Sequence, residues 1–381
     1  MVSSDKLKKL GTSPVHGRLR MNIKYFFLPL LMICFSSQAD EPVMLVDSLN
    51  LYCCDFEVLD TGEIVFAGNE GGICIVSPDT PMEVSKLEIQ WAGQLDEWRS
   101  TGDVTSLSTN HSGSMICFSQ FIRLPENMNI ESDFYIPVPL LVGVCGSDGS
   151  DARLMGLSIE VGGGPIFDFT SDSRYVFGNP FLECLPTPEA YAGYITDEAE
   201  RLEDFLMVNI ETGERSGNPS IIGDGYYLNP YSDLAAAGWY PPNVIIDIET
   251  QEVLLEDTCI DNPTIIYKWV LPYAGLARVD GGQILRYSSG REVENAGDAL
   301  TVYCRLTDGR YVFSTDDGNT VMTGSIDWEN FEAPDAVEIP ELAGIMGSYC
   351  TMKPVPGSSG AVFRSEDALY YIELPMIQDM E

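Results

Sequence analysis

Basic residues and histidine are scarce in this sequence. There are 21 Lys plus Arg against 58 Asp plus Glu, only two His, and a formal net charge of −37. Such a surface repels nucleic acid and anionic head groups, which excludes nucleic acid as an expected partner. The acidic excess is typical of a soluble or salt-adapted protein, with attraction of a basic or cation-bridged partner as the alternative.

Long hydrophobic runs are also missing. The longest, Tyr25–Phe35, follows a basic start at Lys24 and is about half the ~20 residues of a membrane-spanning helix. Small residues then lead to the triplet Ser37–Ala39, the pattern of a cleaved secretory signal peptide. We therefore expect residues 1–39 to be an N-terminal extension plus signal, residues 40–381 to be one domain, and the product to be periplasmic or extracellular without a transmembrane anchor.

The cysteines do not have the spacing of a metal-binding motif. Cys34 lies in the predicted signal peptide, so a lipoprotein signal is the alternative to plain cleavage. Ile33 disfavours this alternative, because the position before a lipoprotein cysteine usually holds a small residue. No CxxC pair occurs, and His111 is the only histidine after residue 39, so a structural zinc site is not expected. The default role of the other nine cysteines is that of small buried hydrophobes, with one or two disulfides as a further expectation. They are Cys53, Cys54, Cys74, Cys117, Cys145, Cys184, Cys259, Cys304 and Cys350.

Helical periodicity is nearly absent. One helix is predicted around Asp197–Phe205, and elsewhere short apolar runs are punctuated by 35 Gly and 23 Pro. Many short strands between turn residues indicate an all-β sandwich, barrel or propeller.

One pattern recurs, a small polar turn followed by a strand rich in Val, Phe and Tyr. The clearest pair is Ser171–Phe177 (SDSRYVF) and Thr307–Phe313 (TDGRYVF). Alternation along these two strands predicts Tyr and Phe on one face and Val on the other. A recurring pattern of this kind indicates a repeated structural unit. The turns are centred near Thr61, Ser112, Asp172, Asp233, Ala274, Asp308 and Ser359.

Each turn is followed by further strands, so each repeat supplies about four. That is one blade of a β-propeller, and the seven turns favour seven blades. The two intervals between turns around Ala274 are short. If they belong to one irregular blade, the propeller has six blades.

The turn-strand segments, together with NIETGE at Asn209–Glu214 and DIETQE at Asp247–Glu252, resemble the repeat of TolB-type and related WD40-like (PD40) propellers of bacterial envelopes. The resemblance covers most of residues 40–381. It implies that the first turn joins the two innermost strands and that the ETG segment joins the two outermost. The separate N-terminal domain of TolB itself has no counterpart here.

Candidate chemistry is sparse. Ser314–Val321 matches the Asp-box turn of sialidase-like propellers, a structural hairpin in which Asp accepts backbone hydrogen bonds. Two acidic loops offer oxygen ligands that would suit calcium, although neither has EF-hand spacing. They contain Asp316, Asp317 and Asn319, and Asp148 and Asp151.

No catalytic or cofactor-binding residue is predicted. His111 lies in a repeat turn and no G-x-S-x-G elbow occurs. The aromatic cluster Tyr226, Tyr227, Tyr231, Trp239 and Tyr240 would suit glycan or peptide binding, with inter-blade packing as the favoured alternative.

These observations favour a non-catalytic, exported binding or scaffolding propeller for a protein or glycan partner. A propeller hydrolase acting on glycans or peptides is the alternative. Binding would use the longer loops Lys86–Asp103 and Pro180–Asp204, which are rich in acids.

Overall fold

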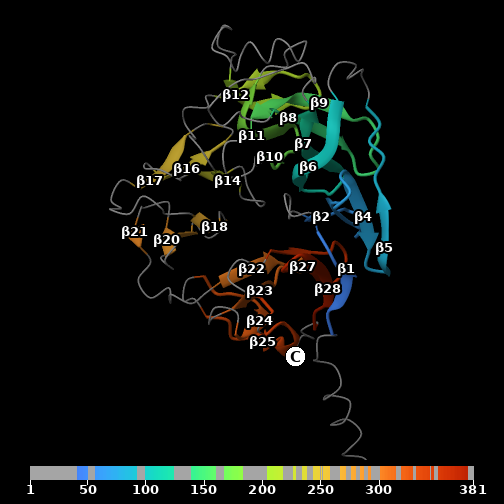
Figure 1. Cartoon of the computed structure of the whole chain (residues 1–381). Coiled ribbons are helices and arrows are strands. Elements are labelled where there is room, and N and C mark those ends of the chain that lie inside the picture. Colours follow the sequence, from blue (N-terminus) through green and yellow to red (C-terminus); the bar gives the residue numbers. More distant parts are fainter. Residues whose placement is uncertain are drawn as a thin grey trace, which may run out of the picture. The chain divides into compact units, whose positions relative to one another are not determined.

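The computed structural model contains strands and one short 3₁₀ helix, Pro340–Leu342, in the part of the chain that it describes (Figure 1). No helix there is long and apolar enough to cross a membrane. All described residues belong to one compact unit, Ala39–Glu381. They are residues 41–49, 56–91, 99–123, 139–159, 167–182, 204–217, 226–228, 234–237, 243–248, 250, 252–257, 267–271, 276–279, 284–286, 291–292, 301–314, 319–328, 332–343, 345–346 and 351–375.

The fold is all-β, and its strands form antiparallel meanders of four. The N-terminal half holds one four-stranded sheet and one eight-stranded sheet. The four-stranded sheet is β2 (Phe56–Val58), β3 (Ile64–Ala67), β4 (Ile73–Ser77) and β5 (Thr80–Lys86). The eight-stranded sheet contains two meanders, β6 (Arg99–Thr109), β7 (Met115–Arg123), β8 (Pro139–Gly146) and β9 (Arg153–Ile159), then β10 (Phe167–Phe169), β11 (Tyr175–Leu182), β12 (Asp204–Asn209) and β13 (Arg215–Ser216).

The C-terminal half holds three four-stranded sheets of consecutive strands and a fourth that is completed from the N-terminal side. The consecutive ones are β14 (Tyr226–Leu228), β15 (Leu234–Ala237), β16 (Asn243–Asp247) and β17 (Val253–Asp257); β18 (Tyr267–Leu271), β19 (Leu276–Val279), β20 (Ile284–Arg286) and β21 (Arg291–Glu292); and β22 (Thr301–Arg305), β23 (Tyr311–Ser314), β24 (Val321–Gly324) and β25 (Val337–Glu338). The last sheet is β26 (Met352–Pro354), β27 (Gly360–Ser365), β28 (Ala368–Glu373) and β1 (Val43–Val46), with β1 paired to β28.

The repeat predicted from the sequence has its expected place in these sheets. The turns near Thr61, Ser112, Asp172, Asp308 and Ser359 fall between the first and second strands of a meander, and both ETG-like segments fall between the third and fourth. The two positions near Asp233 and Ala274 lie outside the described residues. Tyr175–Phe177 and Tyr311–Phe313 are equivalent, since both lie in second strands. In β23, Tyr311 and Phe313 pack in one apolar cluster and Val312 in another, which confirms the predicted alternation.

Apolar clusters lie between successive meanders and explain why many strands are buried on both faces. One cluster joins Val65 of β3 to Phe118 of β7, and another joins Val142 of β8 to Val176 of β11. Two more lie on either side of the last sheet: one brings Val312 to Phe363 of β27, and one brings Leu45 of β1 and Val362 of β27 to Phe56 of β2. Burial of this apolar surface between the meanders is the main stabilising contribution.

Two sequence predictions about loops and helix need correction. Phe205, the end of the predicted helix, lies in strand β12, while most of that helix is outside the described residues. Arg99–Asp103, expected as part of a loop, begins β6, and Pro180–Leu182 ends β11. Both segments extend strands whose cores are buried apolar residues, so tertiary pairing overrides their polar or turn-prone sequence.

Candidate functional site

A row of polar side chains occupies one equivalent position on the first strands of several meanders. The position is counted from the backbone hydrogen bond that closes each repeat turn. In the first repeat the Leu59 N–H donates to Glu63 O, and the residue two places before Leu59 is Glu57. In other repeats the N–H that donates across the turn, to a carbonyl four or five residues later, belongs to Asn110, Thr170, Leu306 or Val355. The equivalent residues are therefore Glu57, Ser108, Asp168, Cys304 and Lys353.

Four of these five residues are polar or charged. Together with Thr109 they form what we call the first-strand cluster: Glu57, Ser108, Thr109, Asp168 and Lys353. Lys353 Nζ lies 2.5 Å from Glu57 Oε1, which joins the last sheet to the β2–β5 sheet. Thr109 Oγ1 donates to Glu57 Oε2 at 3.3 Å, which joins β6 to β2.

Lys353 is held in place by more than its ion pair. Its ammonium lies 5.8 Å from the centre of the Phe56 ring, within cation–π range. The side chains of Lys353 and Glu57 are only 30% and 14% exposed, so their charges are screened less than those of a surface pair.

Asp168 lies on β10, and its pKa departs from the ordinary value of an aspartate. Burial and the nearby charge of Glu57 raise its pKa to about 7, while the Phe169 N–H, Lys353 and Ser108 act in the opposite direction. The Phe169 N–H donates to Asp168 Oδ1 at 2.7 Å, and Ser108 Oγ donates to Phe167 O at 2.8 Å.

A carboxyl group that titrates near neutrality beside a second carboxylate and a lysine can exchange a proton at physiological pH. Such perturbed groups concentrate at functional sites, although structural ion-pair networks also produce them. A hollow of about 410 Å³ lies elsewhere, on strands β4 and β5 and the β2–β3 turn, and none of its lining residues belongs to the cluster.

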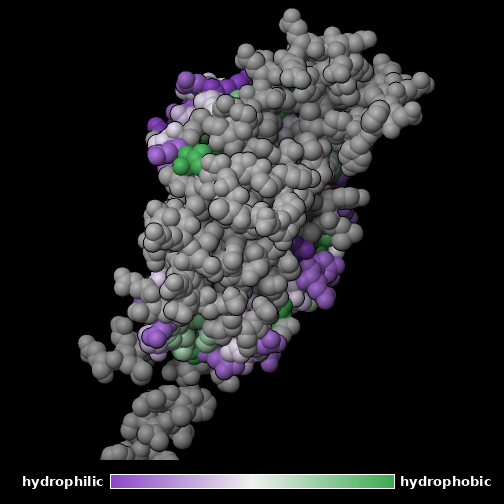
Figure 2. All heavy atoms as spheres, turned by 90° about the vertical axis from the view of Figure 1, so that its left-hand side faces the viewer, coloured by the Kyte–Doolittle hydropathy of each residue, from purple (hydrophilic) through white to green (hydrophobic). Residues whose placement is uncertain are grey.

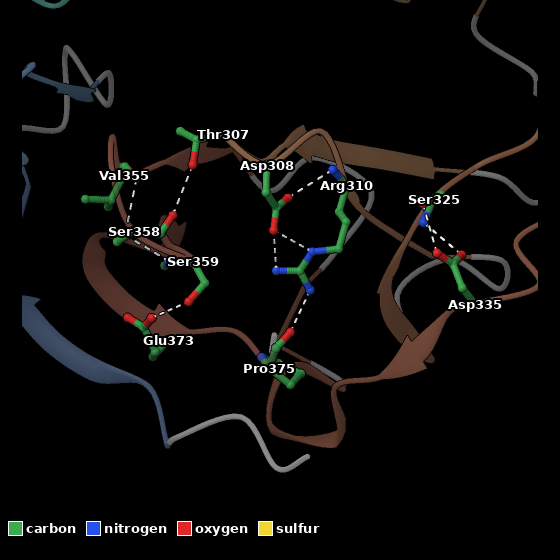
Figure 3. A network of polar contacts seen from close by, with 11 residues as sticks. Thr307, Asp308, Arg310, Ser325, Asp335, Val355, Ser358, Ser359, Glu373 and Pro375 are labelled. Atoms are coloured by element: carbon green, nitrogen blue, oxygen red, sulfur yellow. Dashed lines mark hydrogen bonds and ion pairs between the residues drawn. The ribbon is translucent and has the colours of Figure 1, made fainter. Parts of the chain in front are cut away.

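A second polar network links the repeat turns themselves. Thr307 Oγ1 donates to Ser358 O at 3.0 Å (Figure 3), and Asn110 Nδ2 donates to Ser173 Oγ at 3.3 Å. The backbone N–H of Asp60 donates to Gly113 O at 3.4 Å. Successive turns thus contact one another at the same end of their meanders, which fixes the register between neighbouring sheets.

Arg310 belongs to this turn network. Its Nη2 lies 2.7 Å from Asp308 Oδ2, and its Nη1 donates to Pro375 O at 2.6 Å (Figure 3). The guanidinium therefore ties the β22–β23 turn to the chain that follows β28.

The predicted calcium ligands fall partly outside the described residues. Asp316 and Asp317 lie outside the described residues. Asp148 Oδ1 accepts the Ser150 N–H at 2.9 Å, and hydrogen bonds from Ser150 lower the pKa of Asp148, as in a polar turn. Among the described residues there is no group of three or more Asp, Glu, His or Cys side chains placed to hold a metal ion.

The remaining predicted positions divide between described and undescribed chain. His111 is exposed in the β6–β7 turn, as expected of a turn residue. Tyr226 and Tyr227 lie in β14, whereas the rest of the aromatic cluster (Tyr231, Trp239 and Tyr240) is outside the described residues.

The described cysteines are free thiols. Cys117, Cys145 and Cys304 are buried and Cys74 is partly buried, which confirms the expected role of small core residues for the first three. Burial raises the pKa of all four, to about 12 for Cys145. The expected disulfides do not occur among these four, and the other cysteines lie outside the described chain.

Sequence reasoning missed the first-strand cluster because its members form no local motif. The available signal was positional. Glu57, Asp168 and Lys353 sit at the same offset before the repeat turn, in strands where an apolar residue would be the default.

The chain was compared with protein families, curated proteins and solved structures. No family model and no curated protein matches it. One of the similar solved structures is titled "Crystal Structure of Mitotic Checkpoint Complex"; it covers 99% of this chain and 99% of its own at 13% identity and a TM-score of 0.46. These comparisons assign no family. A superposition and identity this low carry no argument about function.

Proposed function

We propose that the seven meanders close into a seven-bladed β-propeller that acts as an exported, non-catalytic binding or scaffolding module. The blade number is supported by the five four-stranded sheets and the eight-stranded sheet made of two meanders. Separate sheets for β14–β17, β18–β21 and β22–β25 favour seven blades over six. Closure is supported by β1, which supplies the fourth strand of the last sheet and packs against the first.

The proposed family is the TolB-type, WD40-like propeller group. Its support is local, namely the position of the SDSRYVF and TDGRYVF turns between first and second strands and of the ETG-like segments between third and fourth. Export is supported by the signal-like sequence before Asp40.

The observation that carries the binding proposal is an asymmetry between the two ends of the meanders. In an antiparallel meander the connections between strands one and two, and between three and four, lie at one end. Those between two and three, and between successive meanders, lie at the other. Three long acidic connections, residues 87–98, 124–138 and 183–203, belong to this second end, and one, residues 325–336 between β24 and β25, belongs to the first.

The second end is therefore the more acidic candidate for a binding face. Its three long connections carry twelve acidic residues and one basic residue. Loops on a rigid scaffold are the usual location of binding residues, and an acidic face attracts a basic or cation-bridged partner. Figure 2 shows one side of the molecule, where the coloured parts are largely hydrophilic with small hydrophobic patches.

The test compares two charge-matched variants. Glu198, Glu200 and Glu203 of the second end are changed to Gln in one, and Glu211, Glu214 and Glu252 of the first end in the other. Both are used as bait for capture from the native periplasm or medium, and association rates with the captured partner are measured at several salt concentrations. Loss of binding and of salt dependence in the second-end variant alone supports the proposal. Equal loss in both, or none in either, contradicts it.

A hydrolase remains a second candidate because of one observation, the Asp168 carboxyl with a pKa of about 7 near the Glu57 carboxylate. Pairs of carboxyl groups whose pKa values are separated serve as acid and base in glycoside hydrolysis. Turnover of a glycan or peptide that is lost in both Glu57→Gln and Asp168→Asn would establish this activity. Absence of turnover across a panel of glycans and peptides would favour the binding module.

A further inference from the structure

The first meander ends in an exposed edge strand with an irregular pairing. All seven residues of β5 are exposed, and β5 is the last strand of its sheet. After Ser77 pairs with Thr80, four residues of β5 lie opposite the single residue Val76 of β4. The backbone is left-handed at Met82 within this bulge, with φ +68°. A bulge of this size opens space between the two strands.

The hollow described above lies at this bulge. It holds about 410 Å³ and is lined from both strands and from the β2–β3 turn. Ile75, Val76 and Val84 give it an apolar wall. The β2–β3 and β4–β5 turns are connections between strands one and two and between three and four, so the hollow belongs to the first end of the meanders.

Two carboxylates, Glu63 and Glu83, give the hollow its charge. Among the described residues no basic side chain forms an ion pair with either of them. Lys86, the one basic residue of β5, extends over Gly72 and does not line the hollow. Thr61 Oγ1 donates to Glu63 Oε2 at 2.9 Å, which orients this carboxylate. The hollow is therefore matched in charge to a cation.

Exposed apolar side chains lie on the strands beside the hollow. Six large hydrophobic side chains are exposed in the described part of the chain, and four of them belong to β1 and β5. These four are Val43, Met44, Met82 and Val84. The two strands lie side by side without being paired (Figure 1). We call these four residues and the hollow the β1–β5 surface. Exposed apolar surface with a polar rim marks interaction sites.

A second copy of this chain is a poor occupant of the β1–β5 surface. Two chains that each have a formal net charge of −37 repel one another. Pro81 removes a backbone donor from β5, and the bulge distorts the strand, and both features oppose edge-to-edge pairing. A segment with a basic residue is instead attracted by the chain as a whole and by the two carboxylates of the hollow.

We propose that the β1–β5 surface docks an extended segment of a partner protein in which a basic side chain is flanked by apolar ones. The basic side chain enters the hollow beside Glu63 and Glu83. The apolar side chains cover Met82, Val84 and the exposed residues of β1. This surface contains no residue of the long acidic connections at the second end, so it is separate from the binding face proposed above.

The probe is a synthetic peptide, acetyl-Gly-Leu-Ser-Arg-Ser-Leu-Gly-amide. In an extended chain its Leu, Arg and Leu side chains lie on one face, because successive side chains alternate. Binding to the purified full chain is measured by chemical-shift titration at about 0.1 M salt, where the Debye length is ~10 Å. Replacement of Arg by Glu, or of both Leu by Ser, should weaken binding at least about fivefold. Equal binding of either control peptide, or no binding of the probe at about 1 mM, would overturn the proposal.

Two charge-matched variants locate the site. Glu63→Gln combined with Glu83→Gln should weaken binding of the probe about five- to tenfold, the loss expected for two ion pairs in a partly exposed site. Glu211→Gln combined with Glu214→Gln makes the same change in charge at the β12–β13 turn, also at the first end. It should weaken binding by less than about twofold. Equal weakening in both would indicate general attraction to an acidic chain and would contradict the proposal.

A measurement on the wild-type chain covers the case in which a variant does not fold. The backbone amides whose chemical shifts move most when the probe is added should lie in β1, β4 and β5 and in the β2–β3 turn. Movement confined to other strands would show that the probe binds elsewhere and would overturn the proposal.

Discussion

The turns Ser171–Arg174 and Thr307–Arg310 have nearly the same sequence and the same local geometry, but different surroundings. In each, the Asp side chain accepts the backbone N–H of the Arg two residues later, at 2.9 Å in the first turn and 3.1 Å in the second. In each, the same Asp also pairs with the Arg Nε. The Arg174 side chain is 64% exposed, however, and that of Arg310 is 9% exposed.

The difference arises from a partner far away in the sequence. Arg310 donates to Pro375 O, after the last strand, whereas Arg174 lies at the surface over the Tyr175 ring. The motif therefore determines the shape of the turn, and the tertiary neighbour determines how much the arginine contributes to stability. An exposed ion pair contributes about 0–1 kcal/mol, whereas a hydrogen bond made by a charged group contributes about 1.5–3 kcal/mol.

The largest expected effect is on Arg310. Arg310→Ala should lower the free energy of unfolding by about 2 kcal/mol, because Pro375 O loses a hydrogen bond from a buried guanidinium. The Asp308 carboxylate, 45% exposed, remains hydrated and adds little to this loss. Arg174→Ala should cost less than about 0.5 kcal/mol. Urea unfolding of both variants measures this directly, and equal losses would show that the two turns are energetically alike.

A smaller effect is expected at the third position of each turn, where the backbone is left-handed. Gly309 has φ +91°, and Ser173 has φ +59° at the equivalent position. Gly309→Ser should cost about 1–2 kcal/mol in conformational strain. Ser173→Gly should change stability by less, because relief of strain is offset by loss of the bond from Asn110. The pair of thermal unfolding curves distinguishes the two positions, and a larger loss for Ser173→Gly would contradict the comparison.

The smallest effect is expected from Asp172. Burial disfavours its ionised form, but hydrogen bonds and the charge of Arg174 outweigh burial and lower its pKa. A lowered carboxyl pKa stabilises the fold above the unfolded value, near 3.9, and this contribution is lost as pH falls below it. Because the side chain is 39% exposed, Asp172→Asn should cost only about 0.5 kcal/mol at pH 7 and less at pH 3. A larger loss at pH 3 than at pH 7 would reverse the assigned sign.

The sequence predicts the repeated parts of this fold well. The turns near Thr61, Ser112 and Asp308 could be placed because Asp, Ser and Gly have strong turn preferences and the strands after them are rich in Val, Phe and Tyr. The burial of Arg310 and the pairing of Lys353 with Glu57 could not. They depend on residues that lie far apart in the sequence, and nothing local distinguishes Arg310 from Arg174.

The pairing of β1 with β28 has a consequence for the order of events during synthesis. Val43 lies opposite Tyr371, so the earliest described strand finds its neighbour only when almost all of the polypeptide has been made. Until then the apolar residues Leu45 and Val46, which are buried in the finished sheet, have no partner strand. A nascent or truncated chain that lacks β28 should accordingly expose them and be a preferred substrate for chaperones and proteases.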